Sequence, residues 1–186
     1  MEDGSTLVSK YRLGDLGALA TLVHKYTKPV YNFVYRFGNS TDADDITQET
    51  FIKVWKYLNR YDTAKPFAPW LFQIASRTCI DWFRKKKDIT FSDLDPQDSD
   101  KTFAENIQDD SALPDDLFIQ QEYKTIIDTA LAKLPPLYRA VMTLRYMEGY
   151  DIDEIATILE KPAETIKSQH HRALQMLKKQ IKTLHP

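Results

Sequence analysis

Apolar residues recur at helical spacing along most of the chain, whereas the strict alternation of apolar and polar residues that marks a strand is absent. In the first part of the chain they follow one another at Leu19, Leu22, Val23, Tyr26, Val30, Phe33, Val34 and Phe37. Pro29 lies inside this stretch, which predicts a helix with a kink or break near it. After a turn at 38–40, helices are predicted from about 43 to 58 and, beyond prolines 66 and 69, from about 70 to 86.

The C-terminal part of the sequence predicts four more helices. The first spans about 117 to 132, and the second begins at Pro135-Pro136 and ends at Gly149. Two further helices follow between about 151 and 179. Because no internal repeat and no strand pattern is found, we predict an all-α fold.

The last pair of helices has the pattern of a helix-turn-helix. Asp151 is a favourable N-cap, and Glu154 three residues later completes a capping box. The first helix stops near Glu160, and Pro162 suits the first turn of a new helix because its missing N–H costs nothing there. The break of about three residues forces a sharp crossing angle. Apolar residues line one face of both helices: Ile152, Ile155, Ala156, Leu159, Ile166, Ala173, Leu174, Leu177 and Ile181.

The opposite face of the second helix is polar and partly basic: Glu164, Thr165, Lys167, Ser168, His171, Arg172 and Gln175. In a helix-turn-helix, side chains near the N-terminus of this helix reach base edges, while basic ones contact phosphates. The alternative is an ordinary amphipathic helix with a solvated face, but cap, short turn and polar face together favour binding to double-stranded DNA. His170 falls on the apolar stripe, which favours a histidine at the edge of the core over a metal or pH-sensing role.

Charge divides the chain into three parts. The net charge of −2 hides a segment, 88–116, that contains ten Asp and Glu and one Lys, between two mildly basic ends. Because blocks of like charge resist compaction, we predict a linker between a domain at 1–87 and a domain at 117–186. The linker is either a solvated tether or an acidic segment that lies in a basic channel of a partner.

Several function classes find no support in the sequence. No apolar run approaches the ~20 residues that cross a bilayer, and the N-terminus lacks the apolar core of a signal peptide. A cytoplasmic location without membrane insertion is therefore expected. Cys79 is the one cysteine, and no Cys/His cluster has zinc-ligand spacing. We expect neither an enzyme nor a bound metal or cofactor, because no catalytic constellation or glycine-rich phosphate loop is present.

The predicted helix at 43–58 separates polar and apolar groups. Its polar face carries Asp45, Gln48, Glu49 and Ile52, and its apolar face carries Phe51, Val54, Trp55 and Leu58. Paired carboxylates can serve metal or acid–base chemistry, but no His or Cys accompanies them. A protein-docking face is therefore the favoured interpretation.

The segment 65–87 interleaves aromatic and basic side chains. The aromatic residues are Phe67, Trp70, Phe72, Trp82 and Phe83, and the basic residues are Arg77, Arg84, Lys85, Lys86 and Lys87. Aromatic side chains beside a basic patch can stack on unpaired bases, at about 1–3 kcal/mol per base. Most of these aromatics are expected in the core, and stacking on single-stranded nucleic acid is the alternative.

These three stretches, in this order and spacing, resemble the small sigma factors of bacterial RNA polymerase, the extracytoplasmic-function group of the sigma-70 family. ADDITQETFIKVW resembles the region 2 helix that docks on the β′ clamp helices, and PFAPWLFQIASRTCIDWFRKKK resembles the helix that opens and reads the −10 element. The segment 134–179 resembles region 4, which reads the −35 element and touches the β flap. The resemblance covers nearly the whole chain outside the linker, and it implies a linker that runs toward the RNA exit path of the polymerase.

The resemblance implies a promoter-specificity subunit with three sets of contact residues. The set for docking on core polymerase is Asp45, Gln48, Glu49, Phe51 and Trp55. The −10 set is Asp62, Lys65, Phe67, Arg77, Arg84 and Lys85. The −35 set is Thr165, Lys167, Ser168, His171 and Arg172. Promoter DNA and an anti-sigma factor are further implied partners.

Three residues of the helix-turn-helix depart from the family pattern. Glu160 stands where glycine is usual in the turn, and His170 replaces an apolar residue. Gln169 stands where arginine is frequent, which is expected to weaken a phosphate contact.

The alternative from a different class is a stand-alone two-domain regulator, whose N-terminal bundle senses a ligand or dimerises. That alternative leaves the polar face at 43–58 and the aromatic–basic helix unexplained.

Overall fold

The computed structural model describes residues 2–38, 41–87 and 121–184, and within these ranges every regular element is a helix. The side chains described are those of residues 2–38, 41–85 and 127–180. The all-α prediction is therefore confirmed for the described residues. The predicted linker at 88–116 and the start of the helix expected at 117 lie outside them.

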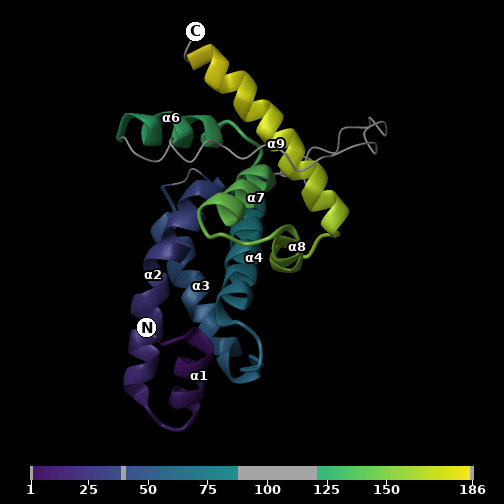
Figure 1. The fold of residues 1–186 in the computed structure, drawn as a ribbon. Coiled ribbons are helices and arrows are strands. Elements are labelled where there is room, and N and C mark those ends of the chain that lie inside the picture. Colours follow the sequence, from purple (N-terminus) through teal and green to yellow (C-terminus); the bar gives the residue numbers. More distant parts are fainter. Residues whose placement is uncertain (1, 39–40, 88–120, 185–186) are drawn as a thin grey trace.

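The N-terminal unit is a bundle of four α-helices. It comprises α1 (Gly4–Arg12), α2 (Leu16–Gly38), α3 (Ala43–Tyr57) with a short 3₁₀ turn (Leu58–Arg60), and α4 (Phe67–Lys87). Its core contains large side chains with almost no exposed surface, among them Leu22, Phe33, Phe37, Ile46 and Phe72. Figure 1 shows α2, α3 and α4 side by side, with α1 against the lower half of α2.

Two features of this unit differ from the predictions. A kink or a break was predicted at Pro29, and the break does not occur, since α2 runs continuously through the proline. Tyr26 before the proline and Val30, Phe33 and Val34 after it are buried, and this packing outweighs the missing backbone hydrogen bond. Helix α4 begins at Phe67 rather than near 70, because Pro69 falls in the first turn, where an N–H has no partner to lose.

The C-terminal unit comprises α6 (Gln121–Ala132), α7 (Pro136–Tyr146), α8 (Ile152–Leu159) and α9 (Ala163–Leu184). The predicted capping box is confirmed: the Glu154 N–H donates to Asp151 Oδ1, and the Asp151 N–H donates to Glu154 Oε2, both at 2.8 Å. Helix α7 ends at Tyr146, three residues earlier than predicted. Gly149, in the connection to α8, has a φ of +78°, a backbone conformation that favours glycine.

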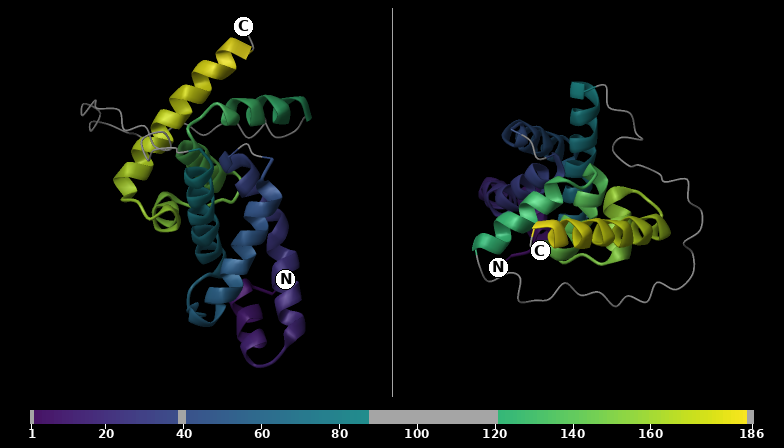
Figure 2. Two further views of the ribbon diagram at one scale, coloured as in Figure 1. Left: turned by 180° about the vertical axis from the view of Figure 1, so that it is seen from behind. Right: turned by 90° about the horizontal axis from the view of Figure 1, so that it is seen from above.

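The two units pack against each other along a shared apolar core. Buried residues of α7 and α8, including Leu137, Val141 and Ile155, belong to the same cluster as Phe33 and Phe72. The rings of Phe72 and Tyr150 meet edge to face with centroids 5.9 Å apart. Figure 2 shows α7 and α8 beside α4 and the upper part of α2, while α6 and α9 lie at that end of the bundle. The helix-turn-helix is therefore held directly against the N-terminal unit.

Candidate nucleic-acid interface

Helix α9 presents the polar face that the sequence predicts. Ile166, Ala173, Leu174 and Leu177 are buried, and the five residues of the −35 set, Thr165, Lys167, Ser168, His171 and Arg172, are all at least partly exposed. Lys167 Nζ lies 2.8 Å from Glu164 Oε1, and this ion pair raises the pKa of Lys167. His171 Nε2 lies 2.9 Å from the amide nitrogen of Gln175. The structure thus brings the whole set to one face of one helix.

Two of the unusual residues of the helix-turn-helix face inward. Gln169 is almost fully buried, so its side chain does not reach a phosphate in this structure, and the expected weakening of a phosphate contact stays a prediction. His170 is half-buried and stacks on Tyr146, with Nε2 3.0 Å from the tyrosine hydroxyl. This contact confirms a histidine at the edge of the core. No group of three His, Cys, Asp or Glu residues that could hold a metal occurs in the described part of the chain.

Glu160 occupies the turn between α8 and α9 in a left-handed conformation, with φ of 55° and ψ of 41°. A residue with a Cβ in this region costs about 1–2 kcal/mol, which is why glycine is favoured at the end of helices. The turn is closed by the Glu160 and Lys161 N–H groups, which both donate to the carbonyl of Ala156. The backbone alone therefore gives no reason for a glutamate here.

The outer face of α3 combines polar and apolar side chains at the surface. Asp45 and Gln48 are exposed, Glu49 is half-buried with its carboxylate 3.0 Å from Lys53 Nζ, and Ile52 is 67% exposed. Trp55, which the sequence places on the apolar face of the helix, is not buried: its side chain is 60% exposed and lies against Tyr11 with ring centroids 6.2 Å apart. Four of the five docking residues are thus reachable on one side of the bundle, while Phe51 is half-buried behind them.

The residues of the −10 set lie along a track rather than at one point. Asp62 and Lys65 are exposed in the loop before α4, which is shaped by a hydrogen bond of 3.0 Å from the Ala64 N–H to Asp62 Oδ1. Arg84, 3.7 Å from Asp81, and Lys85 are exposed near the other end of α4. Since a helix rises 1.5 Å per residue, about 25 Å separates these two ends.

The assignment of Phe67 to DNA contact is corrected by its burial. Its side chain is 1% exposed, and its ring lies 5.2 to 5.5 Å from the rings of Tyr26, Tyr61 and Trp70. Burial also raises the pKa of Tyr61 to about 12, and the protonated hydroxyl donates to the carbonyl of Lys65. Phe67 therefore anchors the loop from inside and has no surface with which to stack on a base.

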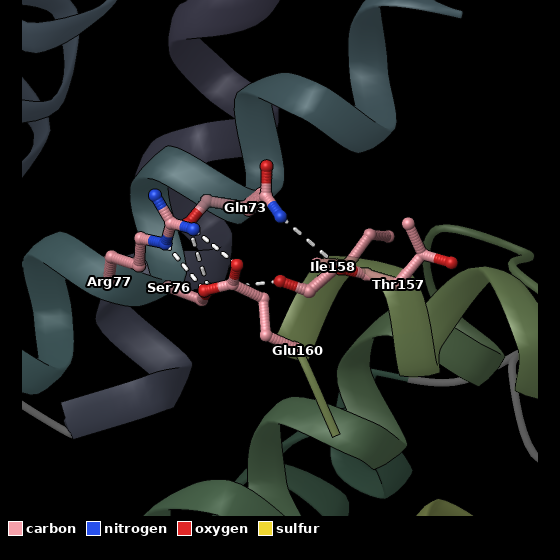
Figure 3. A network of polar contacts seen from close by, with 6 residues as sticks. All are labelled: Gln73, Ser76, Arg77, Thr157, Ile158 and Glu160. Atoms are coloured by element: carbon pink, nitrogen blue, oxygen red, sulfur yellow. Dashed lines mark hydrogen bonds and ion pairs between the residues drawn. The ribbon is translucent and has the colours of Figure 1, made fainter. Parts of the chain in front are cut away.

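The side chain of Arg77 belongs to a network of polar contacts that joins the two units. Its Nε lies 2.6 Å from Glu160 Oε2, and one terminal nitrogen bonds the other carboxylate oxygen. The amide of Gln73 donates to the carbonyl of Thr157 at 3.4 Å, and the Ser76 hydroxyl donates to that of Ile158 at 3.5 Å. Figure 3 shows these three α4 side chains aimed at the end of α8. The ion pair lowers the pKa of Glu160 and raises that of Arg77, so both groups stay charged at neutral pH.

Comparison with protein families places both units in one family. Residues 22–89 match sigma-70 region 2, and residues 124–177 match sigma-70 region 4. The ECF RNA polymerase sigma factor SigW of Bacillus subtilis is 34% identical over 179 residues, which cover 95% of this chain and 96% of the relative. The chain is an extracytoplasmic-function sigma factor of the sigma-70 family. The alternative of a stand-alone two-domain regulator is therefore wrong.

Other relatives agree with this membership. The ECF RNA polymerase sigma-E factor of Escherichia coli is 30% identical over 184 residues, covering 96% of the sigma factor described here and 94% of the relative. Two solved structures share the fold: CnrH in complex with the cytosolic domain of CnrY, and the sigma factor RpoE of Bartonella quintana in complex with the anti-sigma factor NepR. Their TM-scores are 0.68 and 0.64, at 22% and 23% identity, and they cover 98% and 88% of this chain and 99% and 96% of their own.

The fold of this sigma factor also contains features that sequence reasoning missed. Helix α1 was not predicted, although Asp3 caps it by accepting a hydrogen bond from the Ser5 N–H and could have been recognised. The contact between Arg77 and Glu160 joins residues far apart in the chain, and no local pattern signals it. Among the helices that the structure describes, none is long and apolar enough to cross a membrane.

Proposed function

We propose that this sigma factor docks on core RNA polymerase through the outer face of α3 and contacts promoter DNA through two further surfaces. The loop before α4 and the exposed residues of α4 bind the −10 element, and the polar face of α9 binds the −35 element. The factor acts by binding and positioning, without catalysis or a cofactor, and works in the cytoplasm. The domain boundaries at 87/88 and 116/117 belong to the same proposal.

The exposed face of α3 is the observation that carries the docking proposal. An isoleucine and a tryptophan at 67% and 60% exposure lie beside Asp45, Gln48 and Glu49. Interfaces are commonly centred on a few large side chains, tryptophan above all, surrounded by polar groups. The resemblance to region 2 points to the β′ clamp helices as the partner of this face, and to the β flap as a partner of region 4.

The −35 contact is supported by the placement of polar groups at the start of α9. The partial positive charge of a helix N-terminus favours a nearby phosphate. Thr165 and Ser168 lie within the first two turns of α9, and Arg172 follows one turn later on the same face. This is the arrangement in which a recognition helix enters the major groove with its N-terminal residues toward the bases.

The −10 contact is proposed for Asp62, Lys65, Arg77, Arg84 and Lys85, and Phe67 is left out because it is buried. Single-stranded DNA binds along basic tracks on protein surfaces, so a set of cations spread over the length of α4 suits an extended strand. Arg77 joins this set once it leaves Glu160.

Both contacts require that the two units separate. The −10 and −35 elements are named for their positions in the promoter, which are about 25 base pairs apart. At 3.4 Å per base pair this is a distance of roughly 85 Å. In this structure α4 and the turn before α9 touch each other. The 33 residues between Lys87 and Gln121 can reach roughly 110 Å when fully extended, so the chain is long enough for the separation.

Arg172→Ala is expected to reduce transcription by core polymerase from a promoter with both elements by about tenfold, the usual cost of one lost DNA contact. The measurement is run-off transcription with the purified full chain. Lys178→Ala is the matched control, because it removes an exposed cation of α9 six residues beyond Arg172, outside the N-terminal part of the helix that carries the proposed contacts. An equal loss on a template that lacks the −35 element would contradict the assigned role.

An anti-sigma factor is a further proposed partner. The solved sigma factor RpoE of Bartonella quintana, which has the same fold, is held by the anti-sigma factor NepR. Co-purification of the tagged full chain from its own cells, without an inducing stress, is expected to recover a protein that lowers run-off transcription when added back. Recovery of core polymerase alone would contradict this part of the proposal.

A further inference from the structure

We propose that Glu160 occupies the nucleic-acid site at Arg77, so that the turn of the helix-turn-helix competes with the −10 strand for one guanidinium. The inference rests on the proposed role of Arg77 in binding the −10 strand. It adds that the factor carries its own competitor for that site, supplied by the unit that reads the other promoter element.

The geometry of the ion pair is the first support. Both carboxylate oxygens of Glu160 are bonded by two nitrogens of the Arg77 guanidinium. The planar fork of an arginine matches a carboxylate and a phosphate in the same way, through two parallel hydrogen bonds. While Glu160 is in place, the Nε/Nη2 edge of Arg77, one of the two edges that can bind a phosphate through two hydrogen bonds, is occupied.

The contact around the ion pair is built from complementary groups. The last carbonyl groups of a helix have no partner within it. The carbonyls of Thr157 and Ile158, in the last turn of α8, accept hydrogen bonds from Gln73 and Ser76 of α4. The N-terminal unit thus caps the helix that ends at Glu160, and Arg77 lies one turn beyond Gln73 on the same face of α4 (Figure 3).

The backbone of Glu160 is the second, independent support. Its left-handed conformation favours glycine, and the hydrogen bonds that close the turn come from backbone N–H groups. The turn therefore gains nothing from this side chain within its own unit. Among the described residues, Arg77 is the one bonded to the Glu160 side chain, and it belongs to the other unit.

The strength of the ion pair suits a competitor that DNA can displace. The side chains of Arg77 and Glu160 are 57% and 45% exposed, so water and salt screen the pair. Exposed pairs of this kind change an equilibrium by about two- to fivefold. A DNA strand that also contacts Lys65, Arg84 and Lys85 is expected to bind more strongly than the Glu160 carboxylate does, and so to displace it from Arg77.

The test measures how tightly the full chain binds a fluorescent single-stranded oligothymidine at fixed low salt. Glu160→Gln is expected to bind about two- to fivefold more tightly than the natural protein, because the competing charge is lost. Glu160→Gly, which the left-handed backbone favours, is expected to give the same increase with the turn intact. Asp153→Asn is the matched control: it removes an exposed carboxylate of α8 that does not bond Arg77, and is expected to leave binding unchanged.

Arg77→Ala separates the competition from the proposed function. In the Arg77→Ala background, Glu160→Gln is expected to have no effect, because the shared group is gone. If Glu160→Gln and Glu160→Gly bind no better than the natural protein while Arg77→Ala weakens binding, the competition is refuted and the DNA role of Arg77 stands. If Arg77→Ala and the double variant Arg77→Ala/Glu160→Gln both bind as tightly as the natural protein, the competition and the DNA role of Arg77 are both refuted.

Discussion

Phe67→Ala is expected to lower the free energy of unfolding by about 3–5 kcal/mol, the usual cost of removing a fully buried phenylalanine ring. The ring lies between α1, α2 and the loop before α4, in contact with Tyr26, Tyr61 and Trp70. A Cβ on Gly4 would come within 2.7 Å of it, so α1 is fitted closely over this side chain. Chemical denaturation of the full chain, followed by circular dichroism, measures the change.

The same position distinguishes a core residue from a DNA contact. Phe67→Leu keeps most of the buried apolar volume, so it is expected to lose less stability and to bind single-stranded DNA as the natural protein does. If Phe67→Leu kept its stability and lost DNA binding, the ring would have a direct role in contact, and its burial in the structure would not describe the binding form.

Trp55→Ala is expected to weaken binding to core polymerase by about 10- to 100-fold, as loss of a central tryptophan does at protein interfaces. Its side chain is mostly exposed and packs against Tyr11 at the bundle surface, so stability is expected to change by less than about 0.5 kcal/mol. Surface plasmon resonance with immobilised core polymerase measures the affinity, and thermal unfolding measures the stability.

Tyr35→Ala is the matched control for Trp55. Tyr35 is an exposed aromatic residue of the same bundle, but it lies on α2, outside the proposed docking face. Its replacement is expected to leave the affinity unchanged. A similar loss in both variants, or an unchanged affinity in Trp55→Ala, would show that the α3 face is not the docking surface.

Features that depend on neighbouring residues were predictable from the sequence. The capping box of Asp151 and Glu154, the short turn and the two faces of α9 all follow from spacing within a few residues. Helical periodicity therefore suffices to assign the residues of the polar face of α9. Gln169 obeys the same periodicity, since it lies three residues after Ile166 and four before Ala173, and it is buried like them.

Features that depend on distant residues were not predictable in the same way. Trp55 follows the apolar period of α3, but its side chain stays mostly at the surface, with Tyr11 of α1 beside it. Phe67 stands beside basic residues in the sequence, yet α1 closes over it. Pro29 is tolerated because neighbouring helices pack against α2. In each case tertiary contacts decide the outcome, and one-dimensional spacing does not contain them.

The packing of the two units defines a closed form of the factor. In this form Arg77 is bonded to Glu160, and the apolar faces of α7 and α8 share a core with the bundle. The closed form hides one proposed −10 contact and holds the two proposed DNA-binding surfaces too close together for one promoter. The proposed function therefore makes it a form that precedes promoter binding, and it predicts that core polymerase favours its opening.

The most direct test is to prevent the opening. The side chain of Gln73 on α4 bonds the backbone carbonyl of Thr157 on α8, so cysteines introduced by Gln73→Cys and Thr157→Cys lie close to each other. A short, photocleavable, thiol-reactive linker would join them. Cys79, the one natural cysteine, does not compete for the linker, because it is fully buried and burial raises the pKa of its thiol. Run-off transcription with core polymerase is predicted to fail with the cross-linked protein and to return after cleavage by light. Full transcription by the cross-linked protein would show that the two units need not separate.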